Sequence, residues 1–523
     1  MSQVKKTRWK WVVGIVLLLV VVGVILHWPG RVPIEISRET TYITGPLNPD
    51  GTVDYVAYLD QLTSQGVTKD NNAAVLLLQA IGPDALPDET RDEILDRLDM
   101  PALPEDGEYF VRFDAFAESR SENAEDYERL ERQYHDAQRC LCTAEDHPVV
   151  AEWIEANAKP LGLVVAATRR PKFYIPLVSL SDPPGLFDIP LTSLGPCRAA
   201  ARALVIRAML RLDAGDTNGA IDDLLSCHRL ARLLGQRFCL IYDFTSIAIE
   251  RLACDADCML LDTGILSGEQ ARTLLAELEA LPPMPSIADA TDVGERLWDL
   301  GLMLWQHNRS EGGRPCGCAK HMLLSTSGLD MNVVLTTFNR WYDRVVAGMK
   351  EPTFTERNAA ITQWAQDLQR VSDQAEPIHV PCPVVKLTAM RLVGRALRRQ
   401  TSQLVAELWL SVGLPNLGRA APLYDDARMR LELAKVAAAL AAYKAENGAY
   451  PERLEALSPA YMKSITNDLF IEKPLHYERV GDSFLLRSVG PNMAVDKKDA
   501  TERPDKDDLV LPLPPQPEEQ ASE

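Results

Sequence analysis

A hydrophobic run near the start of the chain constrains the fold more than any other feature. It extends from Trp11 to Trp28 and is interrupted only by two glycines and a histidine. At a rise of about 1.5 Å per residue, a helix of this length spans roughly the 30 Å thickness of a bilayer core. Tryptophans stand at both ends of the run, where amphipathic rings prefer the lipid headgroups. The sequence therefore predicts a transmembrane helix over residues 11–28.

The charges beside this run predict its orientation. Basic and acidic residues balance just after it, whereas the stub of residues 1–10 is basic, with Lys5, Lys6, Arg8 and Lys10. Positive charge favours the cytoplasmic side, so we expect a single-pass protein of the inner (cytoplasmic) membrane with its N-terminus in the cytoplasm. The remainder is then extracytoplasmic, or periplasmic. The alternative is a cleaved signal peptide, but the sequence after His27 lacks the small residues of a cleavage site.

Composition narrows the classes of protein and partner. Hydrophobic residues make up 46% and charged residues 25% of the chain, which is typical of a folded protein and excludes global disorder. The formal net charge is −19, which argues against nucleic acid as the main partner, because phosphate binding needs a concentrated positive surface. We expect the lipid bilayer, through residues 11–28, and an envelope protein as partners.

Helical periodicity dominates the chain after an extended linker at residues 29–52. It predicts a helical extracytoplasmic body over residues 53–413. Five prolines in residues 170–195 forbid a continuous helix, so we expect a packed loop there, near which the body could be subdivided. Including a later C-terminal helix, the predicted helices are 53–64, 70–81, 88–98, 122–141, 147–169, 196–213, 217–234, 237–262, 267–281, 289–308, 331–349, 355–375, 384–412 and 424–447.

Residues 198–234 are similar to one helical hairpin of the tetratricopeptide type. Small residues occur where the two helices would touch, and Gly215-Asp216 marks the turn. No fixed period of about 34 residues is visible elsewhere. An αα-hairpin within an irregular bundle and a degenerate repeat array both remain open.

The last hundred residues change from helical to strand periodicity. The helix 424–447 carries apolar residues spaced 4, 3, 4 and 3 apart, and Asn447-Gly448 ends it. A short helix at 452–457 precedes alternating segments at 476–479, 484–488 and 509–511, with a Gly481-Asp482 turn. We therefore expect a small α+β module at 424–511 with a short antiparallel sheet. Residues 512–523 form a Pro- and Glu-rich tail for which disorder is expected. The fold class is mainly α.

The module resembles the globular domain of type II secretion major pseudopilins. The resemblance rests on the run Tyr443–Pro451, on Lys473-Pro474-Leu475 and on Ser488–Asn492. In that family, oxygens in the loop before the last strand bind calcium, and the resemblance carries this role to Asn492, Asp496 and Asp508. Hard oxygen ligands suit calcium. A solvated acidic loop is the alternative, because the loop lacks the family's paired glycines and contains Lys497, Lys498, Arg503 and Lys506.

The resemblance does not extend to filament assembly. Nearly 400 residues separate the predicted membrane helix from the module, and the prepilin processing motif is missing, so we do not expect a pseudopilus subunit. The architecture as a whole resembles uncharacterised bacterial single-pass membrane-anchored proteins, which implies no activity.

Two side-chain groups are candidates for sites in the body. Cys316 and Cys318 lie in a Gly-rich loop and Cys382 lies between prolines, so a loop disulfide among these three is one hypothesis. A zinc site built from Cys316, Cys318 and His321 is another. Four further cysteines fall in apolar helical patterns and are expected to be buried, namely Cys227, Cys239, Cys254 and Cys258. The second group is a basic stripe on helix 384–412, which is either a solvated, ion-paired face or an interaction stripe for an acidic partner or lipid headgroups. Its members are Arg391, Arg395 and Arg398.

No motif in the sequence names a reaction. It contains no G-x-S-x-G elbow, no H-E-x-x-H and no P-loop, so we predict no catalytic residue and no cofactor other than calcium. The sequence favours a membrane-anchored envelope scaffold or protein-interaction protein without catalytic activity. The alternatives are an accessory component of a type II secretion or pilus-like machine, and an anchored hydrolase with an unrecognised site in the helical body.

Overall fold

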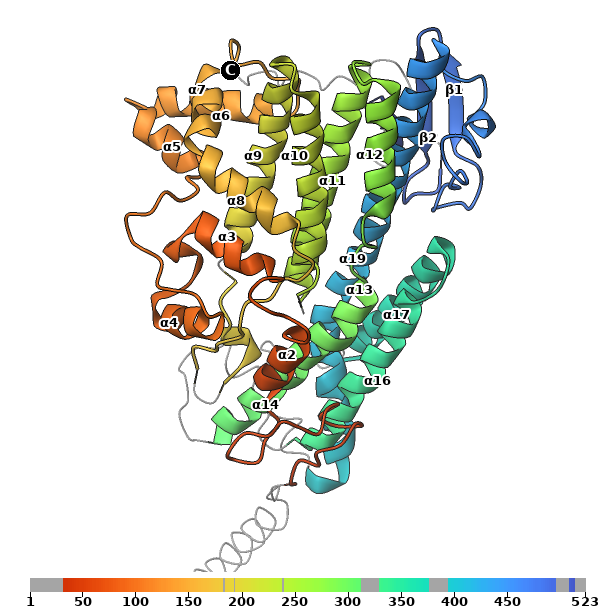
Figure 1. Cartoon of the computed structure of the whole chain (residues 1–523). Helices are drawn as coiled ribbons and strands as arrows, with labels where there is room; N and C mark the ends of the chain where they lie inside the picture. Colours follow the sequence, from red (N-terminus) through yellow and green to blue (C-terminus); the bar gives the residue numbers. More distant parts are fainter. Residues whose placement is uncertain are drawn as a thin grey trace, which may run out of the picture. The chain divides into compact units, whose positions relative to one another are not determined.

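The computed structural model describes residues 32–181, 184–191, 193–237, 239–311, 329–375, 394–494 and 508–512 (Figure 1). They form a mainly helical structure with one small antiparallel sheet, which confirms the predicted fold class at that level. Within these ranges, no helix combines the length and hydrophobicity that crossing a membrane requires. The predicted transmembrane helix, residues 11–28, lies outside them.

The chain divides into two compact units, each built from three segments. Residues 424–511, which the sequence sets apart as a module, lie in the second unit together with much of the predicted helical body. The first unit comprises Met1–Tyr55, Arg296–Val345 and Thr362–Asn416, and the second comprises Val56–Glu295, Val346–Ile361 and Leu417–Glu523.

In the first unit, the segment after the predicted membrane helix is folded onto a helix. Residues 32–54 contain no β-strand, and residues 37–42 form turns instead of the predicted extended linker. The reason is local, because the Thr41 hydroxyl donates to the Ser37 carbonyl at 3.1 Å and to the Ile43 carbonyl at 2.8 Å. The helices that contribute to this unit are α14 (Arg296–Glu311), α16 (Met331–Met349), α17 (Phe354–Ala375) and α19 (Gly394–Asn447).

Two asparagines on α16 hold this segment in place. The amide of Asn339 donates to the carbonyls of Glu39 at 2.9 Å and Thr40 at 2.8 Å, and the amide of Asn332 donates to the carbonyl of Pro33 at 2.9 Å. Because the two asparagines are seven residues apart, they lie on one face of the helix. The chain that follows the predicted membrane anchor is therefore fastened to the body.

The second unit has a bundle of long helices at its centre. Helix α10 packs against α9, α11 and α12, and these helices lie side by side in Figure 1. Gly215, at φ +81°, makes the turn between α9 and α10, and the Asp216 side chain caps α10 by accepting from the Gly219 amide at 2.9 Å. The predicted hairpin is thus present, and α11 packs on both of its helices. The bounds are α9 (Leu194–Asp213), α10 (Thr217–Leu234), α11 (Leu240–Asp262) and α12 (Gly268–Ala280).

Shorter helices and an irregular segment flank this bundle. Among the described residues of 170–195, no long helix precedes α9, and Phe173, Ile175 and Leu177 are buried, which confirms the prediction of a packed loop. The two units do not divide within this segment. The short helices are α2 (Tyr55–Thr63), α3 (Ala73–Ile81), α4 (Asp88–Arg97), α5 (Phe113–Arg120), α6 (Ala124–Ala137), α7 (Pro148–Ala156) and α8 (Ala158–Thr168).

The C-terminal part of the second unit has the predicted helix-and-sheet pattern. The apolar stripe of α19, which includes Met429, Leu433 and Val436, is buried. The buried Asp468 carboxylate accepts from the Val489 amide at 2.8 Å and the Phe470 amide at 3.0 Å. Strand β2 lies between two antiparallel neighbours in the order β1 (His476–Val480), β2 (Ser483–Ser488) and β3 (Leu509–Leu511).

The structure corrects the sequence-based helix assignments in three places. Helix α5 was not predicted, because it is a single short stretch ordered by Phe113 stacking on Tyr134 at 4.3 Å. The predicted helix 147–169 breaks at the buried Asn157, whose side chain accepts from the Val111 amide at 2.8 Å. By contrast, the predicted helices 384–412 and 424–447 merge: α19 is continuous from Gly394 to Asn447, through Pro415 and Pro422. Burial of apolar residues on both sides of these prolines overrides their tendency to end a helix.

Candidate functional site

A buried ion pair joins α9 to α10. The guanidinium of Arg207 makes two hydrogen bonds to the Asp223 carboxylate, at 2.9 and 2.6 Å, and Arg211 adds a third at 2.9 Å. Asp223 has no solvent exposure, so the three bonds replace the water that this carboxylate loses on folding. This group fixes the register of the hairpin.

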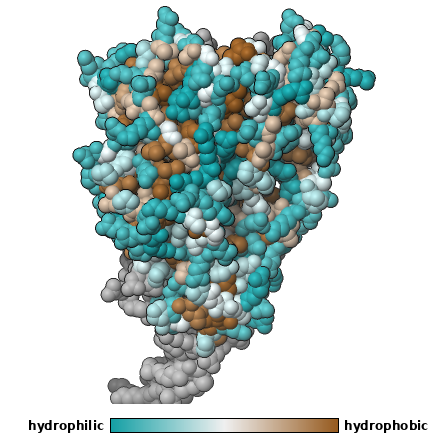
Figure 2. All heavy atoms as spheres, viewed as in Figure 1, coloured by the Kyte–Doolittle hydropathy of each residue, from teal (hydrophilic) through white to brown (hydrophobic). Residues whose placement is uncertain are grey.

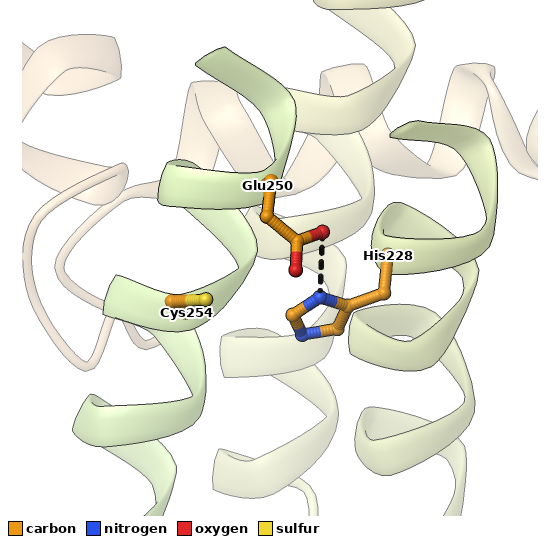
Figure 3. Close-up of side chains that lie close together, drawn as sticks. All are labelled: His228, Glu250 and Cys254. Atoms are coloured by element: carbon orange, nitrogen blue, oxygen red, sulfur yellow. Dashed lines mark hydrogen bonds and ion pairs between the residues drawn. The ribbon is translucent and has the colours of Figure 1, made fainter. Parts of the chain in front are cut away.

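A second buried network joins α10 to α11. The imidazole of His228 lies between two carboxylates, with Nδ1 at 3.0 Å from Glu250 and Nε2 at 2.8 Å from Asp257 (Figure 3 shows the Glu250 bond). Arg232 donates to both oxygens of Glu250, at 2.5 and 2.9 Å, and to the Pro282 carbonyl at 2.9 Å. All four side chains are buried. Two cations and two anions therefore balance in the interior.

Electrostatics fix the protonation of this network. Burial alone would lower the pKa of His228, but the charges of Glu250 and Asp257 outweigh it and raise the pKa to about 9. Burial opposes ionisation of Glu250 in the same way, yet His228 and Arg232 lower its pKa to about 2. At neutral pH, His228 is an imidazolium that donates from both nitrogens.

His228, Glu250 and Cys254 lie close enough together to suggest a metal site (Figure 3). A metal would need a neutral imidazole nitrogen with a free lone pair and a thiolate. Both nitrogens of His228 are engaged by carboxylates, and burial raises the pKa of the Cys254 thiol well above its usual value. We therefore interpret the group as an ion-paired structural network.

A pair of buried carboxyl groups lies at the start of α11. In the part of the chain that the structure describes, neither oxygen of Asp243 has a hydrogen-bond partner, and burial and the nearby Glu295 raise its pKa to about 8. The Glu295 carboxylate accepts from the Leu240 amide at 3.1 Å, and burial raises its pKa as well. Glu295 ends the π-helix Ala290–Glu295, a rare element often found at functional sites. Asp243 is therefore protonated at neutral pH.

A cleft of about 620 Å³ opens in the second unit. One face of α11 forms its floor with Leu252, Cys254 and Met259, and strand β3 forms one side. This volume falls within the range of small-molecule and peptide sites. Because Cys254 is also next to His228 and Glu250, the buried network lies directly behind the floor and holds α11 against α10.

The cleft is more basic than the chain as a whole. Arg139, Arg198 and Arg202 line it, and within the described ranges Arg139 and Arg198 have no acidic partner. Two of the acidic lining residues are ion-paired, since Asp255 accepts from Arg430 at 2.9 Å and Asp508 lies 3.7 Å from Arg487, whereas Asp262 is exposed. Among the described residues, four arginines and three aspartates line the cleft, so its lining carries a net positive charge. On the face seen in Figure 2, hydrophobic residues lie among hydrophilic ones where the long helices run.

The residues predicted to bind calcium do not form a site among the described residues. Asn492 is exposed, and its side-chain oxygen accepts from the Ala494 amide at 2.8 Å. The Asp508 side chain is buried and lies 3.7 Å from Arg487, while Asp496 lies outside the described ranges. Calcium binding stays a prediction.

The other predicted site residues are only partly described. Cys316, Cys318 and Cys382 lie outside the described ranges, as does Arg391. Arg395 is in α19, and Arg398 donates to the Leu329 carbonyl at 2.8 Å, so Arg398 is committed to an internal contact. The cysteines expected to be buried in helical patterns are buried, namely Cys227, Cys239, Cys254 and Cys258.

Sequence reasoning missed both the buried network and the cleft. One signal was present: Glu250 and Asp257 are seven residues apart on the apolar face of α11, and His228 and Arg232 are four apart on α10. Charged residues at helical spacing on an apolar face indicate a buried ionic partner. The sequence does not indicate which helix supplies that partner, because this depends on how the helices pack.

Comparison with known proteins adds no relative. No protein-family model matches the chain, and no curated protein or solved structure is significantly similar to it.

Proposed function

We propose that this chain is a single-pass, membrane-anchored interaction protein of the cell envelope that acts without catalysis and captures a partner protein in the cleft of its second unit. The observation that carries the proposal is the cleft itself, which combines an apolar floor on α11 with arginines at its rim, two of which, Arg139 and Arg198, have no acidic partner among the described residues. Interfaces typically combine an apolar centre with a polar rim, and arginine is enriched in them.

The surroundings of the cleft support binding rather than chemistry. The titratable groups behind its floor are engaged with one another, since His228 binds Glu250 and Asp257. Burial also raises the pKa of the Cys254 and Cys258 thiols well above the usual value, which disfavours the nucleophilic thiolate. The packed side chains of the cleft provide a preorganised surface, which lowers the conformational entropy lost on binding.

The anchor and compartment in this proposal rest on the sequence. The hydrophobic run 11–28 with its basic flank supports an N-in inner-membrane protein whose bulk is extracytoplasmic. The fastening of residues 33–40 to α16 is consistent with this arrangement, because it would hold the body close to such an anchor.

The test is crosslinking of the full-length protein in native membranes, followed by mass spectrometry of captured proteins. Wild type is compared with a variant carrying Arg198→Glu and Arg202→Glu, and with Arg419→Glu as a control at an exposed arginine of α19 outside the cleft. We expect wild type and the control to capture the same partner and the double variant to lose it. Equal capture by all three would reject the cleft as the docking site.

The identity of the captured proteins distinguishes the two alternative functions, an accessory role in a secretion machine and an anchored hydrolase. Recovery of secretion-platform or pseudopilin components would favour an accessory role in a type II secretion or pilus-like machine. A preparation without partners would favour the anchored hydrolase, and the buried Asp243–Glu295 pair would then be the first group to substitute.

A further inference from the structure

The strand at the side of the cleft has an unpaired edge among the described residues. Strand β3 pairs with β2 through the register Leu486↔Leu511 to Ser488↔Leu509, and within the described ranges no strand pairs with its other edge. An edge strand presents unpaired N–H and C=O groups that can accept a further strand. In this chain, those groups belong to a strand that lines a cleft.

All three residues of β3 line the cleft. Leu509 and Leu511 point to the buried face of the sheet and Val510 to the opposite face, yet each of them contributes to the lining. Since successive side chains of a strand point to opposite faces, a cavity that touches all of them runs along the strand. A peptide lying in the cleft would therefore run beside the backbone of β3.

The cleft residues outside β3 indicate which side chains such a peptide would carry. Leu252 and Met259 of α11 and Leu433 of α19 give one apolar surface, whereas Arg139 and Arg198 give a basic one. An extended segment presents alternate side chains to two sides. Apolar residues at every second position would contact the helices, and acidic residues between them would reach the arginines.

We propose that the cleft binds an acidic, extended segment of a partner protein, which adds to the edge of β3 as a further strand of the sheet. The inference rests on the proposed function and names the partner's chemistry. Backbone hydrogen bonds to β3 supply affinity for any extended chain, and the rim arginines select alternating acidic and apolar residues. Three strand residues span about 10 Å, so a short segment fills the site.

The test uses synthetic peptides with the purified full-length protein in detergent. The probe is a fluorescently labelled hexapeptide of alternating Glu and Val, and fluorescence anisotropy measures its dissociation constant. A Lys-Val hexapeptide tests the charge preference. An acidic hexapeptide N-methylated at alternate backbone nitrogens keeps the charge and removes strand hydrogen-bond donors.

We expect the Glu-Val peptide to bind at least tenfold more tightly than the Lys-Val and the N-methylated peptides. The variant with Arg198→Glu and Arg202→Glu should lose binding, and Arg419→Glu should keep it. Equal binding of the N-methylated and unmethylated acidic peptides would overturn strand addition, and absence of acidic-peptide binding would overturn the whole inference. If native crosslinking still depends on Arg198 and Arg202 in those cases, the proposed function stands without this ligand.

Discussion

The Nε2 atom of His228 lies 2.8 Å from a carboxylate oxygen of Asp257, a residue 29 positions further along the chain. The contact joins α10 to α11 inside a fully buried group that also contains Glu250 and Arg232. An ionic group of this kind is stable only when complete, because removal of one member leaves an uncompensated buried charge.

The first prediction concerns the loss of one member of this buried ionic group. His228→Leu should lower the free energy of unfolding by about 3–5 kcal/mol, since Asp257 then loses its hydrogen-bonded counter-charge. Urea unfolding of the full-length protein, followed by circular dichroism, measures the change. His135→Leu is the matched control, because His135 is exposed on α6 and should have little effect.

A combined substitution tests whether the loss of stability comes from the unpaired buried charge. Replacing His228, Glu250 and Asp257 by Leu and Arg232 by Met removes every charge of the group at once. This variant should recover most of the stability that His228→Leu loses, because an apolar core of similar volume carries no unpaired charge. A quadruple variant less stable than the single one would contradict this account.

The second prediction concerns alkaline pH. Because the pKa of His228 is raised from 6.5 to about 9, its stabilising contribution is complete below pH 6.5 and is lost as the pH rises towards 9. The melting temperature of wild type should therefore fall between pH 7 and 10. In His228→Gln the fall should be smaller, since Gln carries no titratable proton. Parallel curves for the two proteins would show that another group controls this range.

Asp243 should destabilise the protein at neutral and alkaline pH. Its pKa is raised from 3.8 to about 8, so the folded state keeps a proton that the unfolded chain has released, and stability falls as the pH rises from 4 to 8. Asp243→Asn should thus raise the melting temperature more at pH 8 than at pH 4. Asp70→Asn, at an exposed carboxylate, should shift neither value. An equal effect of Asp243→Asn at both pH values would exclude a pKa shift as the cause.

Membrane topology gives a further prediction. A reporter that is active only outside the cytoplasm, fused after residue 60, should be active in intact cells. A fusion after residue 60 in which the basic residues of the stub 1–10 are replaced by Glu should lose much of this activity, because the charge bias that orients residues 11–28 is then reversed. Activity of a cytoplasmic reporter at residue 60 of the natural sequence would overturn the proposed compartment.

The elements that the sequence predicts best are those with local causes. Helices α9 to α12 follow from apolar spacing and from turn and cap residues such as Gly215 and Asp216, which act on their immediate neighbours. The β1–β2 hairpin likewise follows from alternating residues around Gly481-Asp482. In such segments, the residues that determine the structure are all within a few positions of one another.

The failures have mainly tertiary causes. The break between α7 and α8 lies at Asn157, whose side chain binds the backbone of Val111, 46 residues earlier, although Pro160, which has no amide to bond the Ala156 carbonyl, adds a local cause. Helix α19 continues through Pro415 because apolar residues on both sides of it are buried. Neither contact leaves a periodic signal in the sequence.

The sequence by itself determined that the chain is mainly helical, where most helices run, and that strands 476–480 and 483–488 form a hairpin. Only the tertiary structure decided that His228 meets Glu250 and Asp257, and that β3 and α11 line one cleft with arginines at its rim. The physical reason is the range of the interactions. Periodicity and turn chemistry act over a few residues, whereas the pairing of buried charges depends on how far each helix is rotated and shifted against its neighbours.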